Sequence, residues 1–117
     1  MDLLKVAAKI ARGQGDIKRN YLLAAVVKRN DGALVVSPNA LTKEPEPNAH
    51  AEARALRKAD SGSTLYVARV LRDGGWALAR PCKRCQALIR SMRVRKVYYT
   101  IGPGEYGVWD PKKSKTP

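Results

Sequence analysis

The chain has 117 residues, of which 23 are Lys or Arg and 10 are Asp or Glu, so its net charge is +13. This length accommodates one domain with a hydrophobic core but leaves no room for a second. No apolar run approaches the ~20 residues needed to cross a bilayer, and the N-terminus becomes charged too early for a secretory signal. Two cysteines are too few for a secreted disulfide scaffold, which favours a reducing, cytoplasmic location.

The first part of the chain predicts a helix followed by a hairpin. Residues 3–12 have the apolar spacing of an amphipathic helix. Residues 21–28 form a continuous apolar run, which is typical of a strand buried on both faces. The segment Asn30-Asp31-Gly32 predicts a tight turn, because glycine accepts the positive φ that such a turn requires. Residues 33–37 would then be the antiparallel partner strand.

The second part of the chain alternates helices with strands. The predicted elements, in order, are a loop at 38–48, a helix at 50–59, strands at 64–71 and 76–79, a helix at 82–92, and strands at 95–101 and 106–109. This alternation predicts parallel neighbours joined by helical crossovers. We therefore expect an α/β fold with a mixed, mostly parallel sheet of about five strands, covered by helices on both faces. Residues 1–110 would form this single domain, and the basic residues 111–117 a disordered tail.

Every histidine and cysteine of the chain falls in one of two short motifs. The one histidine begins His50-Ala51-Glu52, and both cysteines lie in Pro81-Cys82-Lys83-Arg84-Cys85. A zinc ion held by imidazole and thiolates would therefore use His50, Cys82 and Cys85, which leaves the fourth tetrahedral position to water, as in catalytic sites. Taken singly, the motifs also fit a packing histidine, a redox cysteine pair and a glutamate that complements a helix dipole. Their coincidence favours catalytic zinc.

Both motifs are predicted at helix N-termini, which explains how they can meet. Helices that follow parallel strands start at the same edge of the sheet, where ligands bind in open α/β folds. The field of a helix N-terminus and the metal itself both lower the pKa of a thiol. Zinc also lowers the pKa of bound water from about 15.7 toward ~7. Glu52, two residues after His50, can then relay protons without binding the metal.

The motif pair H-x-E and P-C-x-x-C resembles that of the zinc-dependent cytidine deaminase-like superfamily. Residues 50–53 resemble the family's H-A-E-x motif, and residues 93–99 resemble the strand that follows its cysteine motif. The similarity spans about residues 20–101 in the family's order of elements. It implies one Zn²⁺ per chain on the histidine and the two cysteines, with Glu52 as the proton shuttle.

The reaction that the resemblance implies is hydrolytic deamination at C4 of cytosine or C6 of adenine. Asn39 matches an asparagine that often contacts the substrate sugar in the family, although a turn residue after a proline is an alternative role. The backbone N–H groups of Ala51 and Cys82 would contact the base or the developing oxygen, since helix N-termini present free donors. Pro81 completes the predicted substrate contacts.

The charge distribution favours a polynucleotide substrate. No acidic residue lies between Gly74 and Gly104, where seven basic residues surround the cysteine motif: Arg80, Lys83, Arg84, Arg90, Arg93, Arg95 and Lys96. Basic surfaces with aromatic platforms suit single strands. The predicted nucleic-acid contacts are Arg80, Lys83, Arg84, Trp76 and Tyr106, with Trp109 as a further stacking candidate. These aromatic side chains could equally fill the core. The prediction is conversion of cytosine to uracil in a single-stranded polynucleotide.

Three alternatives stay open. The first is free deoxycytidylate or cytidine, although the tetrameric cytidine enzymes usually have cysteine where His50 stands. The second is a tRNA-type adenosine deaminase. This chain differs from those enzymes in its turn at Arg72–Gly75, and no C-terminal helix is predicted in its last 16 residues. The third is a non-enzymatic, zinc-stabilised nucleic-acid-binding module. No membrane partner is expected, and small domains with an exposed helix face often pair, which allows a homodimer.

Overall fold

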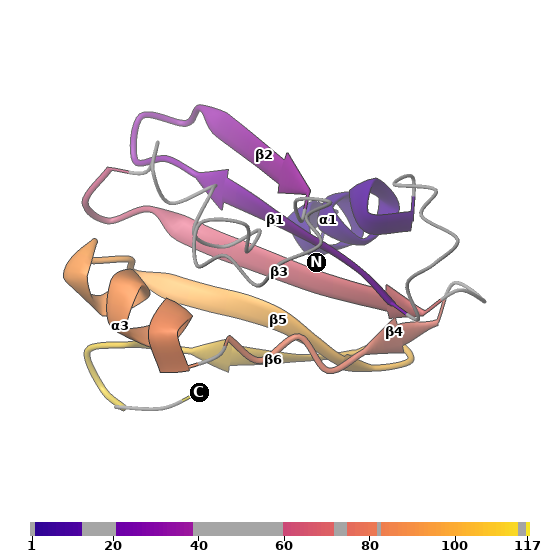
Figure 1. Ribbon diagram of the computed structural model, residues 1–117. Helices are drawn as coiled ribbons and strands as arrows, with labels where there is room; N and C mark the ends of the chain where they lie inside the picture. The colour runs from indigo at the N-terminus through magenta and orange to yellow at the C-terminus, as the bar shows by residue number, and fades with distance from the viewer. Residues whose placement is uncertain (1, 13–20, 39–59, 72–74, 82, 115–116) are drawn as a thin grey trace.

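The computed structural model arranges strands and helices in layers around one sheet (Figure 1). It describes residues 2–12, 21–38, 60–71, 75–81, 83–114 and 117. Within them, the helices are α1 (Asp2–Arg12) and α3 (Lys83–Ser91), and the strands are β1 (Tyr21–Lys28), β2 (Leu34–Pro38), β3 (Thr64–Leu71), β4 (Trp76–Ala77), β5 (Lys96–Gly102) and β6 (Glu105–Trp109). The predicted helix at 50–59 lies outside the described residues. Of the two described helices, with 11 and 9 residues, neither has the length needed to span a bilayer.

The described strands form a six-stranded sheet in the order β2-β1-β3-β5-β6, and β4 pairs with the last part of β3. The α/β class and the mixed sheet are confirmed. The prediction of a mostly parallel sheet is wrong for these strands, because only β3 and β5 run parallel. Parallel neighbours need a long crossover, and in the described part of the chain α3 provides one between β3 and β5. Short turns join β1 to β2 and β5 to β6, so these pairs are antiparallel hairpins.

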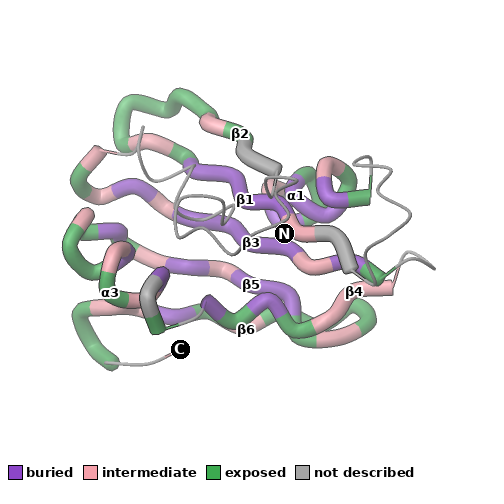
Figure 2. The backbone as a smooth tube through the Cα atoms, viewed as in Figure 1, coloured by how far each residue is buried: buried purple, intermediate pink, exposed green. Residues whose placement is uncertain are grey.

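Side chains alternate between two apolar cores, one on each face of the sheet. Ala24, Val26 and Tyr66 pack with α1 on one face. Val27 and Leu65 pack with α3 on the other face. The mostly apolar sequences of β1 and β3 agree with burial on both faces. Figure 2 shows buried residues along both strands, whereas residues 34–36 of β2 are exposed or half-buried. The prediction that helices cover both faces is confirmed.

The turn between β1 and β2 has the predicted glycine geometry and is tied to the loop before β3. Gly32 has a φ of 91°, and its N–H donates to the carbonyl of Arg29 at 2.9 Å. Across the loop, the Asp60 carboxylate accepts the N–H of Asn30 at 2.9 Å and the hydroxyl of Ser63 at 2.5 Å. These hydrogen bonds, the Asn30 bond foremost, hold the pKa of Asp60 below its ordinary value of 3.8.

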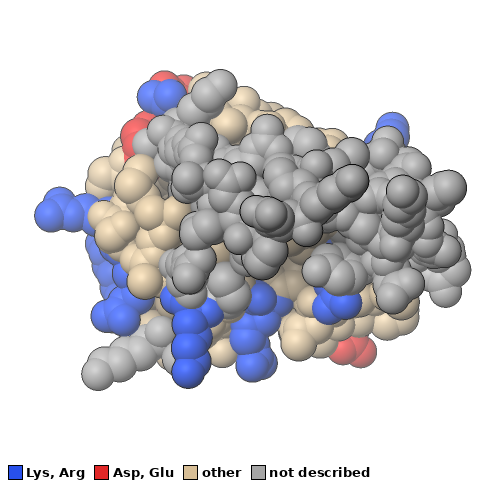
Figure 3. All heavy atoms as spheres, in the orientation of Figure 1, with Lys and Arg blue, Asp and Glu red and all other residues tan. Residues whose placement is uncertain are grey.

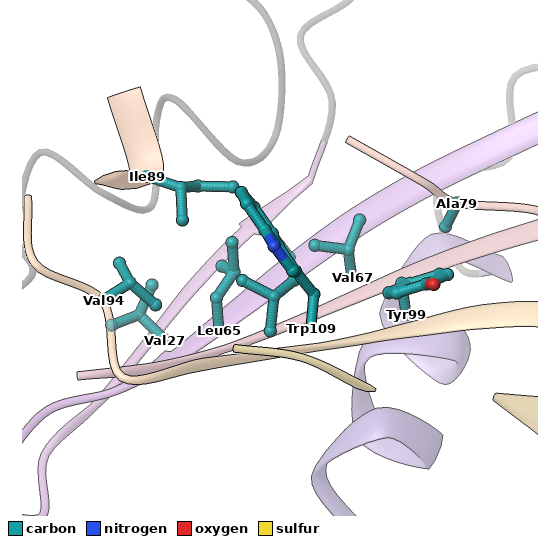
Figure 4. Close-up of a cluster of buried hydrophobic side chains, with 10 residues drawn as sticks. Val27, Leu65, Val67, Ala79, Ile89, Val94, Tyr99 and Trp109 are labelled. Carbon is teal, nitrogen blue, oxygen red and sulfur yellow. The ribbon is translucent and has the colours of Figure 1, made fainter. Parts of the chain in front are cut away.

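Trp109 closes the core beneath α3. Its side chain is 2% exposed, and Figure 4 shows the indole ring between Ile89 and the side chains of the sheet. Its Nε1 donates to the carbonyl of Ser114 at 3.0 Å, and the Asp110 carbonyl accepts the N–H groups of Lys113 and Ser114. The suggestion that Trp109 stacks on bases is therefore wrong. The segment predicted to be disordered begins with a hydrogen-bonded turn in the structure, and the division into one domain and a tail stays a prediction.

Gly107 makes room for a core tyrosine, so Gly107→Ala is expected to destabilise the protein. A Cβ at position 107 would lie 2.6 Å from Cζ of Tyr99, whose side chain is only 7% exposed and has little freedom to move. We expect the free energy of unfolding in urea to fall by about 1–3 kcal/mol, the usual range for overpacking. Gly102→Ala is the matched control, because nothing lies within 4 Å of its added Cβ. Equal unfolding midpoints for the two variants would contradict this packing.

Candidate active site

Lys83, Arg84 and Cys85 of the cysteine motif form the start of α3. The helix begins at Lys83, directly after Cys82, and Pro81 is buried. Pro81 lies two residues before the helix, so the prediction that it occupies the first helical turn is wrong. Gln86 Nε2 reaches back to donate to the Pro81 carbonyl at 2.7 Å. This hydrogen bond fixes the entry of the chain into the first helical turn.

Cys85 lies on the buried side of α3. Cys85 is 3% exposed. Leu88 and Ile89 follow it by three and four positions along the helix and pack into the core on the same side. Lys83 and Ala87 are exposed on the other side. The helix therefore holds Cys85 away from bulk water.

A buried hydroxyl on β5 holds the segment that leads to the cysteine motif. Thr100 is fully buried, and its Oγ1 donates to the Ala77 carbonyl at 2.7 Å and accepts the Arg69 N–H at 3.0 Å. Its own carbonyl accepts the Ala79 N–H at 2.9 Å. Thr100 was not among the residues predicted from the sequence. Its signal was a small hydroxyl residue in a strand of mostly aromatic and aliphatic residues, because buried hydroxyl groups need hydrogen-bond partners.

Several predicted site residues lie outside the described residues, namely Asn39, His50, Ala51, Glu52, Cys82 and the side chain of Arg84. Among the described side chains, no group of three His, Cys, Asp or Glu gathers, and two of the three predicted zinc ligands are not among them. The convergence of the two motifs stays a prediction.

The sheet register supports that convergence. Strands β2 and β3 both run antiparallel to β1, with Pro38 and Ala68 on either side of Ala24. The two strands therefore point in the same direction. The segment that leaves β2 toward His50 and the segment that leaves β3 toward Cys82 consequently start from the same edge of the sheet.

The predicted nucleic-acid contacts fall on two different faces. Arg80 and Lys83 are exposed beside the start of α3, close in the chain to Cys85. Trp76 instead packs against the core under α1. Tyr106 lies against Tyr98, with ring centroids 6.3 Å apart and tilted rings. The sheet therefore separates both aromatic side chains from the cysteine motif.

Three tyrosines form a ladder on the α1 face. Tyr98 stacks on Tyr66 with ring centroids 5.1 Å apart, and Tyr106 extends the row at the exposed edge. Burial is the main cause that raises the pKa of Tyr66, with a smaller contribution from Tyr98. This ladder explains the position of Tyr106 by packing within the protein.

Comparisons with known proteins agree with this architecture. The family model described as the cytidine and deoxycytidylate deaminase zinc-binding region matches residues 1–101. No curated protein sequence matches the chain. Among solved structures, the fold is similar to a crystal structure of cytidine deaminase from Burkholderia pseudomallei, with a TM-score of 0.66, 20% identity, and coverage of 96% of this chain and 93% of that chain. The family match, carried by most of the chain, and the shared fold show that this protein belongs to the cytidine deaminase-like superfamily.

Proposed function

We propose that this protein is a zinc-dependent hydrolytic deaminase that converts cytosine to uracil in single-stranded polynucleotide. Membership of the deaminase family supports the reaction. The substrate class rests on one observation: the residues from Gly75 to Pro103, which include α3, carry no acidic side chain, and Arg80, Lys83 and Arg90 are exposed there. A surface of one sign attracts a polyanion and raises its local concentration.

The donor set fits one zinc ion per chain. Cys85 places a buried thiol in the first turn of α3, three residues after Cys82 in the chain, and this C-x-x-C spacing is typical of two thiolates that bind one zinc ion. His50 would complete the set. When bound, zinc lowers the pKa of water to about 7 and supplies a nucleophile at neutral pH. Two thiolate ligands also agree with the reducing cytoplasm that the cysteine content favours.

The remaining residues would bind the base and move protons. Glu52 takes a proton from water and delivers it to N3 of cytosine as oxygen adds to C4. It then takes the remaining proton of the hydroxyl added at C4 and passes it to the amino group, so that the C4 carbonyl forms as the C4–N bond breaks and ammonia leaves. Asn39 would position the sugar, Pro81 would contact the base, and the N–H groups of Ala51 and Cys82 would orient it.

A second candidate is deamination of free cytidine or deoxycytidylate. The fold matches the solved cytidine deaminase over 93% of that protein's length. A tRNA-type adenosine deaminase has less support, because the chain after β5 continues directly into strand β6. A polynucleotide and a free nucleotide carry different numbers of phosphates, so the two candidate functions predict different dependences of activity on salt concentration.

Salt dependence is the test of substrate class. For a single-stranded oligonucleotide that contains one cytosine, three or four neutralised phosphates give a slope of log affinity against log salt of about −2 to −3. We therefore expect kcat/KM to fall roughly 20–50-fold between about 50 and 200 mM salt. Mass spectrometry of oligonucleotide and free deoxycytidylate, assayed side by side, measures this. Fast turnover of deoxycytidylate and slow, salt-insensitive turnover of the oligonucleotide would favour the second candidate.

A further inference from the structure

Cationic side chains gather at the end of the sheet near the last residues of α3. We call this group of side chains the end patch. Its members are Arg90, Arg93, Arg95, Lys96, Lys112 and Lys113. Strand β6 runs back along β5 and places Trp109 opposite Val97, so the turn that follows β6 lies beside the start of β5. Figure 3 shows Lys and Arg side chains along the left and lower margins of the molecule, toward α3 and this end of the sheet.

The end patch is not neutralised from within the described structure. Five of its side chains are exposed and Lys96 is half-buried. The ion pairs among the described residues are both made by Arg29, with Asp31 and Asp60. The nearest acidic residue in the chain, Asp110, uses Oδ1 to accept the backbone N–H of Lys112 at 3.0 Å. The six cations therefore repel one another and leave a strongly positive surface.

Arg93 occupies a position that favours glycine. The N–H of Val94 donates to the Ile89 carbonyl at 3.3 Å, and that of Arg93 to the Arg90 carbonyl at 3.2 Å, which together form a Schellman motif at the end of α3. Arg93 is its left-handed residue, with a φ of 56°. Residues with a Cβ are strained in this region, and glycine is not. The Schellman motif accounts for the left-handed backbone, so what distinguishes this position is an exposed arginine where glycine would be less strained.

We propose that the end patch is a second binding surface, outside the catalytic centre, for the phosphate backbone of single-stranded nucleic acid. Along α3, Arg90 lies five residues after Cys85, a rise of about 7.5 Å at 1.5 Å per residue, and the other members of the end patch follow the end of the helix. One strand of several nucleotides can therefore contact both. The inference rests on the proposed function in that its ligand is the polynucleotide substrate.

Two pairs of variants test the end patch. Lys112→Ser/Lys113→Ser removes two charges from it, and Lys5→Ser/Lys9→Ser removes two exposed charges from α1. Binding of a fluorescent oligothymidylate is followed by anisotropy at several salt concentrations. We expect the first pair to weaken binding about 3–10-fold and to reduce the salt slope by about 0.7 per lost phosphate contact. The α1 pair should bind like the unmodified protein. Equal weakening by both pairs would mean a response to net charge alone and would overturn the proposal.

Arg93→Gly separates binding from helix stability. Glycine relieves the left-handed strain, so we expect an unfolding midpoint in urea equal to or above that of the unmodified protein, together with weaker oligothymidylate binding. Arg93→Lys keeps the charge and should retain most of the binding. A lower midpoint for Arg93→Gly with unchanged binding would show that the arginine serves the helix dipole, against the proposal.

The experiments distinguish an error in the end-patch proposal from an error in the proposed function. Deamination of a cytosine oligonucleotide with the same KM in the end-patch variants would refute the patch and leave the proposed function standing. Patch-dependent oligothymidylate binding by a protein that deaminates only deoxycytidylate would support the patch and refute the polynucleotide reaction. Polyglutamate that competes as well as oligothymidylate would refute nucleic acid as the ligand.

Discussion

Glu52→Gln is expected to abolish nearly all deaminase activity while zinc content and folding stay unchanged. Glutamine has the same shape as glutamate but cannot accept a proton from water or deliver protons to the base and the leaving ammonia. General acid–base catalysis contributes about 10²–10⁴-fold, and Glu52 would act in two successive proton transfers, so we expect kcat to fall at least ~10³-fold. Mass-resolved deamination of the preferred substrate measures the rate. Zinc per chain by elemental analysis and the unfolding midpoint complete the measurement.

Glu105→Gln is the matched control for this variant. Glu105 is an exposed residue on β6, and its substitution makes the same change in charge. Its kcat should stay within twofold or so of the unmodified rate, since exposed substitutions are usually mild. Full activity of Glu52→Gln would remove glutamate from the mechanism. No turnover by the unmodified protein, with oligonucleotide binding intact in both variants, would favour the non-enzymatic binding module.

The fold was predictable where burial alone decides the structure. Strands at 21–28 and 64–71 were located correctly because both are apolar on two faces, and the ends of α1 and α3 were within one residue. The pairing direction was not predictable in the same way. Short turns such as Gly102–Glu105 impose an antiparallel partner, whereas the alternation of elements suggested crossovers. Pairing direction depends on the length of each connection rather than on the order of elements.

The candidate site was predictable from residue chemistry but not from packing. The sequence located the cysteine motif at a helix start, since proline and thiols have clear positional preferences. It could not assign Thr100, because the partners of its hydroxyl come from β3 and β4 and depend on the register of the sheet. Nor could the sequence show that Trp109 fills the core and is not an exposed residue that stacks on bases. A tryptophan in a short terminal strand has the same local sequence in both cases.

Cys85→Ser is expected to remove the metal and, with it, part of the stability of the protein. A serine hydroxyl is not ionised at neutral pH and is a weaker zinc ligand than a thiolate. We expect zinc affinity to fall by more than the ~10–100-fold that follows the loss of an outer-shell contact. A ligand that binds the folded state stabilises it by about 4 kcal/mol at 1,000 times its dissociation constant. The unfolding midpoint should fall accordingly, and activity should be lost.

Chelation separates the loss of metal from a packing defect at this buried position. If Cys85 binds zinc, a chelator should lower the unfolding midpoint of the unmodified protein toward that of Cys85→Ser and leave the variant unchanged. Ala87→Ser introduces the same side chain at an exposed site two residues along α3 and should keep both its zinc and its sensitivity to the chelator. A full equivalent of zinc in Cys85→Ser would show that Cys85 is not a ligand. Cys85, which is buried, would then serve packing, and the chain would lack the donor set for a catalytic zinc.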